Sequence, residues 1–199
     1  MISEILLASA SSARARLLAA AGLEVKAEPA PVDEASLKRT CCAAGQSPED
    51  CALALAEAKA RQVAARHHRA LVIGADQLLV CDGSWFDKPP TLRDARAQLW
   101  ALRGNTHELV TAVCVVQGAA LLWQAVSRPI LAMRAYSEAF LDDYIAAEGT
   151  QLLGSAGAYR LEGRGVQLFE RVEGDYFAIL GLPLMELLGF LQDYGAIRS

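Results

Sequence analysis

The chain has 199 residues, of which 53% are hydrophobic and 21% are charged, so it can build one domain with a sizeable core and does not have the composition of a disordered chain. Its mean hydropathy of +0.22 is high, yet a polar or charged side chain interrupts every apolar stretch before about 18 residues, which excludes a membrane-spanning helix. The net charge of −4 argues against non-specific binding to a nucleic-acid backbone.

The first half of the chain alternates short apolar runs with helical patterns. We predict strands at 5–8 and 23–27, a helix over 14–21 that ends at Gly22, and a helix from Ser47 to about Arg66. Pro48 and the two acidic residues after it are typical of a helix start. Two β-like runs follow at 70–73 and 78–81, on either side of Asp76.

The second half continues the alternation. We predict a helix over 92–102, a hairpin formed by 109–116 and 121–126, a helix over 137–147, a strand over 166–172, and a last helix from Pro183 to near Gly195. No repeat or long linker divides the chain. The order indicates an α/β protein with a mixed sheet rather than a strict βαβ repeat.

The five cysteines are odd in number and show neither a C-x-x-C pair nor a metal-ligand spacing with the three histidines. A disulfide scaffold and a zinc site are therefore not expected, and a reducing cytoplasm is the natural setting. The N-terminal segment faintly resembles a signal peptide, but it lacks a basic start and carries Glu4, so we expect a first strand there.

One candidate anion site follows the first predicted strand. Ser9 and Ser11 provide hydroxyl groups just before a predicted helix start, and Arg14 lies within its first turn. Backbone N–H groups and the positive end of the helix dipole suit a phosphate group there, and a guanidinium can donate to two phosphate oxygens. The alternative is an ordinary helix cap with a surface arginine.

Acidic residues provide a second candidate feature. Asp76 stands between apolar runs, where an ionised carboxylate needs a cation or a hydrogen-bond donor. Asp33 and Glu34 are adjacent carboxylates that can bind Mg²⁺ through oxygen, with Asp76 as a further ligand. The alternatives are a turn aspartate that bonds its own backbone and a solvated acidic loop.

Two lysines can support an anionic ligand. Lys59 lies in the predicted alanine-rich helix, and Lys88 precedes two prolines that stiffen an extended segment. Solvated surface lysines are the alternative for both. His107 has no carboxylate or serine at a recognisable triad spacing, and the chain contains no Walker A loop and no G-x-S-x-G nucleophile turn.

Taken in order, these segments resemble the Maf family of nucleoside triphosphate pyrophosphatases over nearly the whole chain. The matching segments are Leu7-Ala8-Ser9-Ala10-Ser11 with Arg14, Val32-Asp33-Glu34, Ala58-Lys59-Ala60, Ile73-Gly74-Ala75-Asp76, Asp87-Lys88-Pro89, Leu102-Arg103-Gly104 with His107 and Thr111, Ala156-Gly157-Ala158-Tyr159, Glu162-Gly163, Gly174-Asp175-Tyr176 and Gly181-Leu182-Pro183. Each segment alone is weak, but their common order is very specific.

The resemblance implies a single Maf-like domain over 1–199 with the Maf/ITPase-like fold, an elongated mixed sheet flanked by helices with two lobes around a nucleotide cleft. It implies a cytoplasmic homodimer that splits a nucleoside triphosphate into a monophosphate and pyrophosphate with Mg²⁺, Mn²⁺ or a similar divalent metal. Neither a nucleic acid nor a membrane is an expected partner.

The resemblance also assigns roles by position. It implies that Ser9, Ser11, Arg14, Lys59 and Lys88 bind the substrate, that Asp76 and Glu34 are catalytic and hold the metal, and that Asp76 is the general base. Phosphoryl transfer depends mainly on positioning and charge neutralisation, so cationic side chains with a metal suffice for it.

Departures from the family pattern concern recognition of the substrate's nucleobase. Gln77 and Glu162 resemble the branch that prefers 7-methyl-GTP, because the dTTP/UTP branch has Thr and Gln at these positions and an Asp-Lys pair where this chain has Gly154-Ser155. Both residues are therefore candidate substrate contacts. Ala13 replaces a frequent arginine, whose phosphate contact Arg16 could supply. A dTTP/UTP pyrophosphatase of the same family and a non-catalytic nucleotide-binding regulator of cell division remain the alternatives.

Overall fold

The computed structural model describes residues 4–198, and within them the chain forms two compact units. Unit 1 comprises the chain up to Gln77, Val110–Ser127 and the segment from Asp175 onward, and unit 2 comprises Leu78–Leu109 and Arg128–Gly174. The strands β3 (Leu71–Cys81) and β5 (Thr106–Gln117) each contribute residues to both units. None of the helices described is long and apolar enough to cross a membrane.

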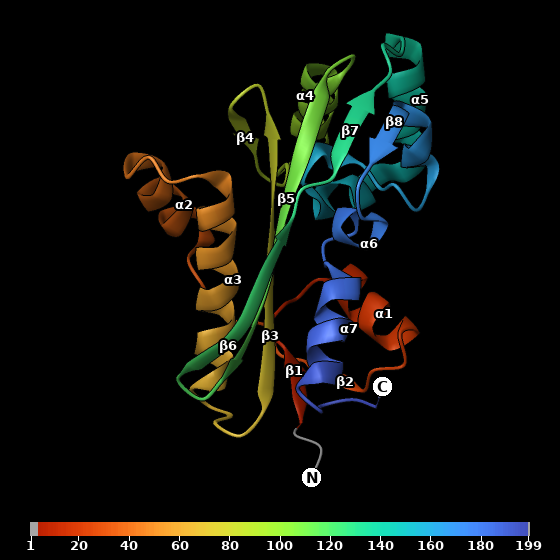
Figure 1. Ribbon diagram of the computed structural model, residues 1–199. Helices are drawn as coiled ribbons and strands as arrows, with labels where there is room; N and C mark the ends of the chain where they lie inside the picture. The colour runs from red at the N-terminus through yellow and green to blue at the C-terminus, as the bar shows by residue number, and fades with distance from the viewer. Residues whose placement is uncertain (1–3, 199) are drawn as a thin grey trace. The chain divides into compact units, whose positions relative to one another are not determined.

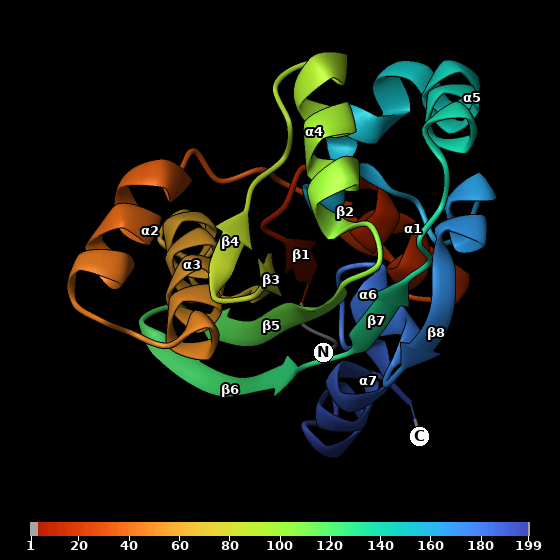
Figure 2. The ribbon, with the colours of Figure 1, turned by 90° about the horizontal axis from the view of Figure 1, so that it is seen from above.

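Unit 1 contains a parallel group of strands extended by a hairpin. Its other elements are β1 (Ile5–Leu7), α1 (Ser12–Ala20), β2 (Val25–Ala27), α2 (Glu34–Ala43), α3 (Pro48–Ala64), β6 (Ala120–Ser127), α6 (Tyr176–Ile179) and α7 (Leu184–Asp193). β1 pairs in parallel with β2 and with β3, while β6 runs antiparallel to β5 (Figure 1). Figures 1 and 2 both show α2 lying beside α3.

Unit 2 is built on antiparallel pairs. Its other elements are β4 (Ser84–Phe86), α4 (Leu92–Leu102), β7 (Ile130–Met133), α5 (Glu138–Glu148), β8 (Phe169–Glu173) and the short 3₁₀ helices Gly149–Gly154, Ala156–Ala158 and Arg164–Leu168. β4 pairs with β3, and β7 lies between β5 and β8. Across the described residues the hydrogen-bonded strand order is β2-β1-β3-β5-β7-β8, with β4 on β3 and β6 on β5, which confirms the predicted α/β class with a mixed sheet.

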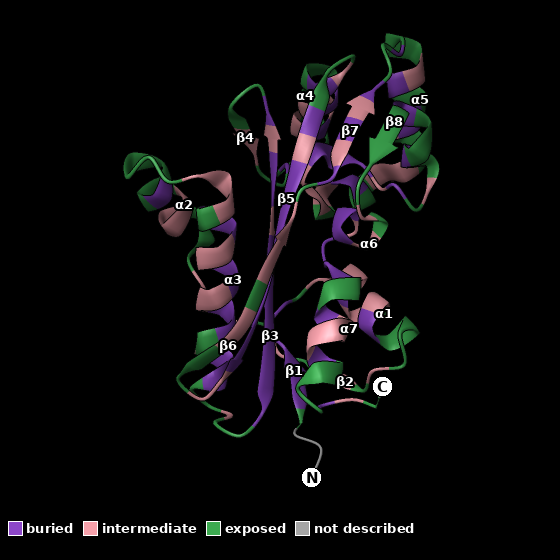
Figure 3. Cartoon of the chain, in the orientation of Figure 1, coloured by how far each residue is buried: buried purple, intermediate pink, exposed green. Residues whose placement is uncertain are grey.

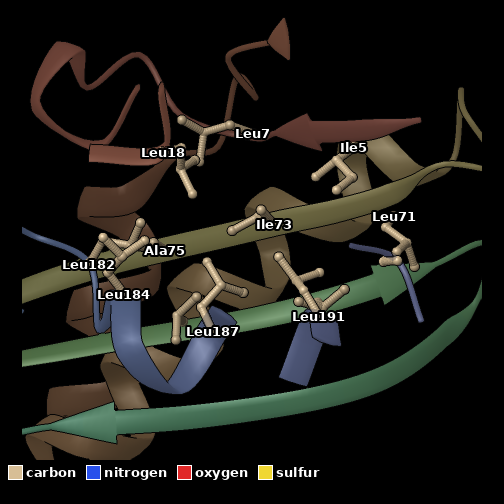
Figure 4. Close-up of a cluster of buried hydrophobic side chains, with 13 residues drawn as sticks. Ile5, Leu7, Leu18, Leu71, Ile73, Ala75, Leu182, Leu184, Leu187 and Leu191 are labelled. Atoms are coloured by element: carbon tan, nitrogen blue, oxygen red, sulfur yellow. The ribbon is translucent and has the colours of Figure 1, made fainter. Parts of the chain in front are cut away.

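The core of unit 1 lies between β3 and the helices α1 and α7. β3 is buried along most of its length (Figure 3), and its side chains alternate between two faces. Leu71, Ile73 and Ala75 point to one face, where they meet Leu18 of α1 and Leu187 of α7 (Figure 4). The opposite face carries Gly74 and Asp76 and is covered by α3.

Gly74 explains how close α3 lies to the sheet. A Cβ atom at this position would lie 2.1 Å from the backbone oxygen of Ala56 and 2.8 Å from the Cβ of Ala60, both in α3. No larger side chain fits there without moving the helix. The missing side chain therefore lets α3 pack its small residues directly on β3. Lys59 lies between the two contact residues of α3, and Asp76 lies two residues after Gly74 on the strand.

Several predicted boundaries were wrong. The segment 70–81 is one continuous strand rather than two runs around Asp76, α1 begins at Ser12 rather than Arg14, and the strand predicted over 166–172 is a 3₁₀ helix followed by β8. The short strands β4 and β7 and the helices α2 and α6 were not predicted. β4, β7 and α6 have only three or four residues and carry too little periodicity to be recognised, whereas α2 has ten residues and was missed.

A buried histidine in unit 2 makes stability depend on pH. His107 is 1% exposed, its Nε2 lies 2.9 Å from the hydroxyl oxygen of Tyr159, and burial lowers its pKa from 6.5 to about 4. The unfolded chain therefore binds more protons than the folded one between these values. The stability due to neutral His107 is fully present above pH 6.5 and is lost as the pH falls toward 4.

We expect the free energy of unfolding of the parent protein to fall by about 2 kcal/mol between pH 7.5 and pH 5 through His107 alone. Urea unfolding of His107→Gln at both pH values should show a correspondingly smaller fall, because glutamine does not titrate. The exposed His68 gives the matched variant His68→Gln, which should behave like the parent. An equal fall in the parent and in His107→Gln would contradict this assignment.

Candidate functional site

The N-terminal end of α1 places Ser9, Ser11 and Arg14 together in unit 1. Ser11 is the N-cap, and its Oγ accepts a hydrogen bond from the backbone N–H of Arg14 at 3.4 Å. Ser9 Oγ accepts from Arg14 Nη1 at 3.1 Å and from the backbone N–H of Ser11 at 3.2 Å. Arg14 is only 8% exposed, so the surface-arginine alternative is wrong.

The guanidinium of Arg14 is held from the opposite side by the backbone. Its Nε donates to the carbonyl oxygen of Gly181 at 2.7 Å. Burial lowers the pKa of Arg14, and the negative charges of Asp76 and Glu34 act in the opposite direction. The two acidic residues are therefore part of the electrostatic surroundings of this arginine.

Asp76, Lys59 and Glu34 form one cluster in unit 1. Lys59 Nζ lies 2.5 Å from Asp76 Oδ1 and 2.7 Å from Glu34 Oε1. The side chains of Lys59 and Asp76 are 9% and 7% exposed, while that of Glu34 is 48% exposed. The ion pair with Lys59 excludes both the solvated lysine and the turn aspartate that bonds only its own backbone.

Local structure explains how these three side chains meet. Asp76 lies on the face of β3 that α3 covers, and Lys59 directly precedes Ala60, one of the residues of that helix that contact Gly74. Glu34 is the first residue of α2, where Asp33 is the N-cap and its Oδ1 accepts from the backbone N–H of Ser36 at 2.9 Å. The acidic segment at 33–34 is thus the start of a helix and not the solvated acidic loop given as the alternative.

The formal charges of Asp76, Glu34, Lys59 and Arg14 cancel. A triphosphate brought to this cluster therefore needs further positive charge. Carboxylate oxygens are hard ligands, and Mg²⁺ is commonly bound by one or two carboxylates together with substrate phosphates. Asp76 and Glu34 provide two carboxylates of this kind. No group of three or more metal-ligating side chains occurs within residues 4–198, so they do not form a complete protein cage for a metal.

Gln77 occupies the next position on β3 and points to the other face of the strand. Its Nε2 donates to Thr111 Oγ1 at 2.8 Å and to the carbonyl oxygens of Ala178 and Ile179 at 2.9 and 3.3 Å. Thr111 is fully buried, and its hydroxyl donates to the same Ala178 oxygen at 3.0 Å. No feature of the sequence indicated these backbone acceptors, and Thr111 appeared only within the family pattern.

The other two predicted site residues belong to unit 2. Lys88 is exposed in the segment after β4. Glu162 follows the 3₁₀ helix Ala156–Ala158, and its Oε1 lies 3.6 Å from Arg160 Nε. Arg16, the expected substitute for an arginine at position 13, is exposed and donates to Ser12 Oγ at 3.3 Å.

Comparison with known proteins finds a family match over nearly the whole chain. A family model described as "Maf-like protein" matches residues 4–194. A nucleoside triphosphate pyrophosphatase of Granulibacter bethesdensis is 52% identical over 98% of both chains, and one of Rhodospirillum rubrum is 46% identical over 100% of this chain and 98% of its own length. A 7-methyl-GTP pyrophosphatase of Mesorhizobium japonicum is 46% identical over 99% of both chains.

Proposed function

The chain belongs to the Maf family, and from this premise we propose that it is a nucleoside triphosphate pyrophosphatase. Water attacks the α-phosphorus, a new oxygen–phosphorus bond forms, and the bond from that phosphorus to the oxygen bridging the α- and β-phosphates breaks. The bridging oxygen leaves with pyrophosphate, and the other product is the nucleoside monophosphate. The relatives quoted above carry names that state this class of reaction.

The observation that carries the proposal is the pairing of Asp76 and Glu34 on one buried ammonium group beside Arg14. A regulator that only bound nucleotide would need the cationic side chains but not two carboxylates held together. In the proposed reaction Asp76 accepts the proton of the attacking water, since a positioned carboxylate near a phosphate can act as a general base. Lys59 Nζ, which lies 2.5 Å from Asp76 Oδ1, holds this carboxylate in one orientation.

The remaining residues bind the polyphosphate. Arg14 is oriented by Gly181 and Ser9, so that its remaining N–H groups can donate to phosphate oxygens. We propose that Ser9, Ser11 and Lys88 also bind the polyphosphate of the substrate. Asp76 and Glu34 would hold a divalent cation such as Mg²⁺ or Mn²⁺, which when bound neutralises phosphate charge.

For the base, we propose 7-methyl-GTP or a related modified nucleotide as the preferred substrate, with Glu162 as a contact. A carboxylate can accept hydrogen bonds from guanine N–H groups and offset the positive charge of a methylated ring. Some relatives are named for this substrate and others more broadly. A preference for dTTP or UTP is the alternative.

Replacing Glu162 tests the base assignment. In Glu162→Gln we expect kcat/KM for 7-methyl-GTP to fall about 10-fold while kcat/KM for UTP changes less than 2-fold, because only the cationic base loses a charged partner. Glu173→Gln on β8 is the matched control on an exposed glutamate. An equal loss for both nucleotides would contradict a contact between Glu162 and the base.

The activity itself is tested by pyrophosphate release from 7-methyl-GTP, GTP, dTTP, UTP, CTP and ATP with Mg²⁺ or Mn²⁺. Turnover of 7-methyl-GTP above the others supports both parts of the proposal, whereas preference for dTTP or UTP supports the reaction and rejects the base. Binding without turnover of any nucleotide would favour the regulator. We also propose that the protein is a cytoplasmic homodimer. Light scattering on the purified protein tests the dimer.

A further inference from the structure

Gln77 has no spare N–H group on its side chain. An amide nitrogen carries two hydrogens, and Nε2 of Gln77 already lies within hydrogen-bond distance of the Thr111 hydroxyl and of two backbone carbonyls in α6. A donor engaged in this way is poorly suited to reading a base. The amide of Gln77 instead donates to carbonyl oxygens of the short helix α6.

The segment from Asp175 to Gly181 connects Gln77 to the phosphate-binding arginine. Both carboxylate oxygens of Asp175 accept N–H bonds at the start of α6. The Ala178 carbonyl oxygen, which accepts from Gln77 and Thr111, also accepts from the backbone N–H of Gly181 at 2.9 Å. The carbonyl oxygen of Gly181 in turn accepts from Arg14 Nε at 2.7 Å.

Gly181 also limits where the guanidinium of Arg14 can lie. Its φ angle of +104° is one that residues with side chains rarely adopt, and a Cβ atom there would lie 3.4 Å from Arg14 Nε. The segment therefore contacts Arg14 through the backbone of Gly181, which has no side chain. The segment is held by the amide of Gln77 on β3 and the hydroxyl of Thr111 on β5, both of which donate to the Ala178 oxygen.

We propose that Gln77 is a positioning residue for Arg14 and acts through the segment 175–181, with Thr111 as its partner, rather than by contact with the base. This inference rests on the proposed function insofar as Arg14 binds the substrate's polyphosphate. Loss of the Gln77 amide then weakens binding of every triphosphate by a similar factor, because the phosphate end is common to all of them. It also weakens binding of inorganic pyrophosphate, which has no base.

The test uses Gln77→Leu, which is close to glutamine in size and has no amide. We expect KM to rise about 10-fold for 7-methyl-GTP, GTP and UTP alike, and the Kd of inorganic pyrophosphate, measured by calorimetry with Mg²⁺, to rise by a similar factor. Gln124→Leu, on an exposed glutamine of β6, is the control. A change confined to one base, or an unchanged pyrophosphate Kd, would overturn the proposal.

Two further measurements separate positioning from a general loss of structure. The effects of Gln77→Leu and Arg14→Lys on pyrophosphate Kd should be less than additive when combined, since both act on one contact. Thr111→Val should show the same uniform weakening and Thr111→Ser, which retains the hydroxyl, should restore binding. Additive effects would overturn the proposal, and so would a Thr111→Ser variant as weak as Thr111→Val.

Failure of the proposed function would look different. If the parent protein bound pyrophosphate but hydrolysed no triphosphate, the pyrophosphatase activity would be rejected. The calorimetric comparison of the parent, Gln77→Leu and Arg14→Lys would still decide whether Gln77 positions Arg14.

Discussion

Asp76→Asn should lower kcat for pyrophosphate release by at least about 100-fold while the KM for nucleotide stays within about 3-fold of the parent value. Removal of a general base typically costs 10² to 10⁴ in rate. Asparagine retains the shape of the side chain and can still accept a hydrogen bond from Lys59 Nζ, which lies 2.5 Å from Asp76 Oδ1. Steady-state kinetics at saturating Mg²⁺ is the measurement.

The matched control for this variant is Asp82→Asn. Asp82 is exposed in the turn after β3 and has a φ angle of +47°, a conformation that asparagine tolerates well. We expect it to retain the parent kcat. Parent-like turnover by Asp76→Asn would remove Asp76 from the role of base.

Lys59→Met should lower the free energy of unfolding by about 3 to 5 kcal/mol, a loss typical of breaking one partner out of a buried ion pair. Methionine fills similar space but leaves the buried carboxylate of Asp76, whose side chain is 7% exposed, without the ammonium group that pairs with it. Glu34 adds to the effect, although its greater exposure screens it. Urea unfolding at pH 7 measures the difference.

Two comparison variants make the cause identifiable. Lys26 is exposed on β2, so Lys26→Met should change the free energy of unfolding by less than 0.5 kcal/mol, as is usual for surface substitutions. Adding Asp76→Asn to Lys59→Met should recover part of the loss, because the side chain at position 76 is then neutral and needs no cation. If the double variant were less stable than Lys59→Met alone, the unpaired carboxylate would not be the cause.

Much of the fold could be predicted because its longer elements have clear periodicity and caps. α3, with Ser47 as N-cap, Pro48 first and an alanine-rich stripe, was recognised, and so was the hairpin of β5 and β6. α6 could not be predicted, because four residues show no helical period and its stability comes from the Asp175 cap and from contacts with Gln77 and Thr111. Such contacts depend on tertiary structure.

For the site, the sequence indicated residue types but not their pairing. An aspartate between apolar runs required a cation, yet nothing local showed that Lys59, 17 residues earlier, would supply it. Gly74 was a local indication that another element packs against β3 here, since a glycine inside a strand often marks a close backbone approach. The role of Gly181 could not be predicted, because its carbonyl oxygen bonds Arg14, which lies 167 residues earlier in the chain.

The most direct test of the account is hydrolysis of 7-methyl-GTP in ¹⁸O-labelled water, with the products separated and analysed by mass spectrometry. Attack on the α-phosphorus predicts one ¹⁸O atom in the nucleoside monophosphate and none in pyrophosphate. Label in the pyrophosphate, or release of orthophosphate with a diphosphate product, would contradict the proposed reaction.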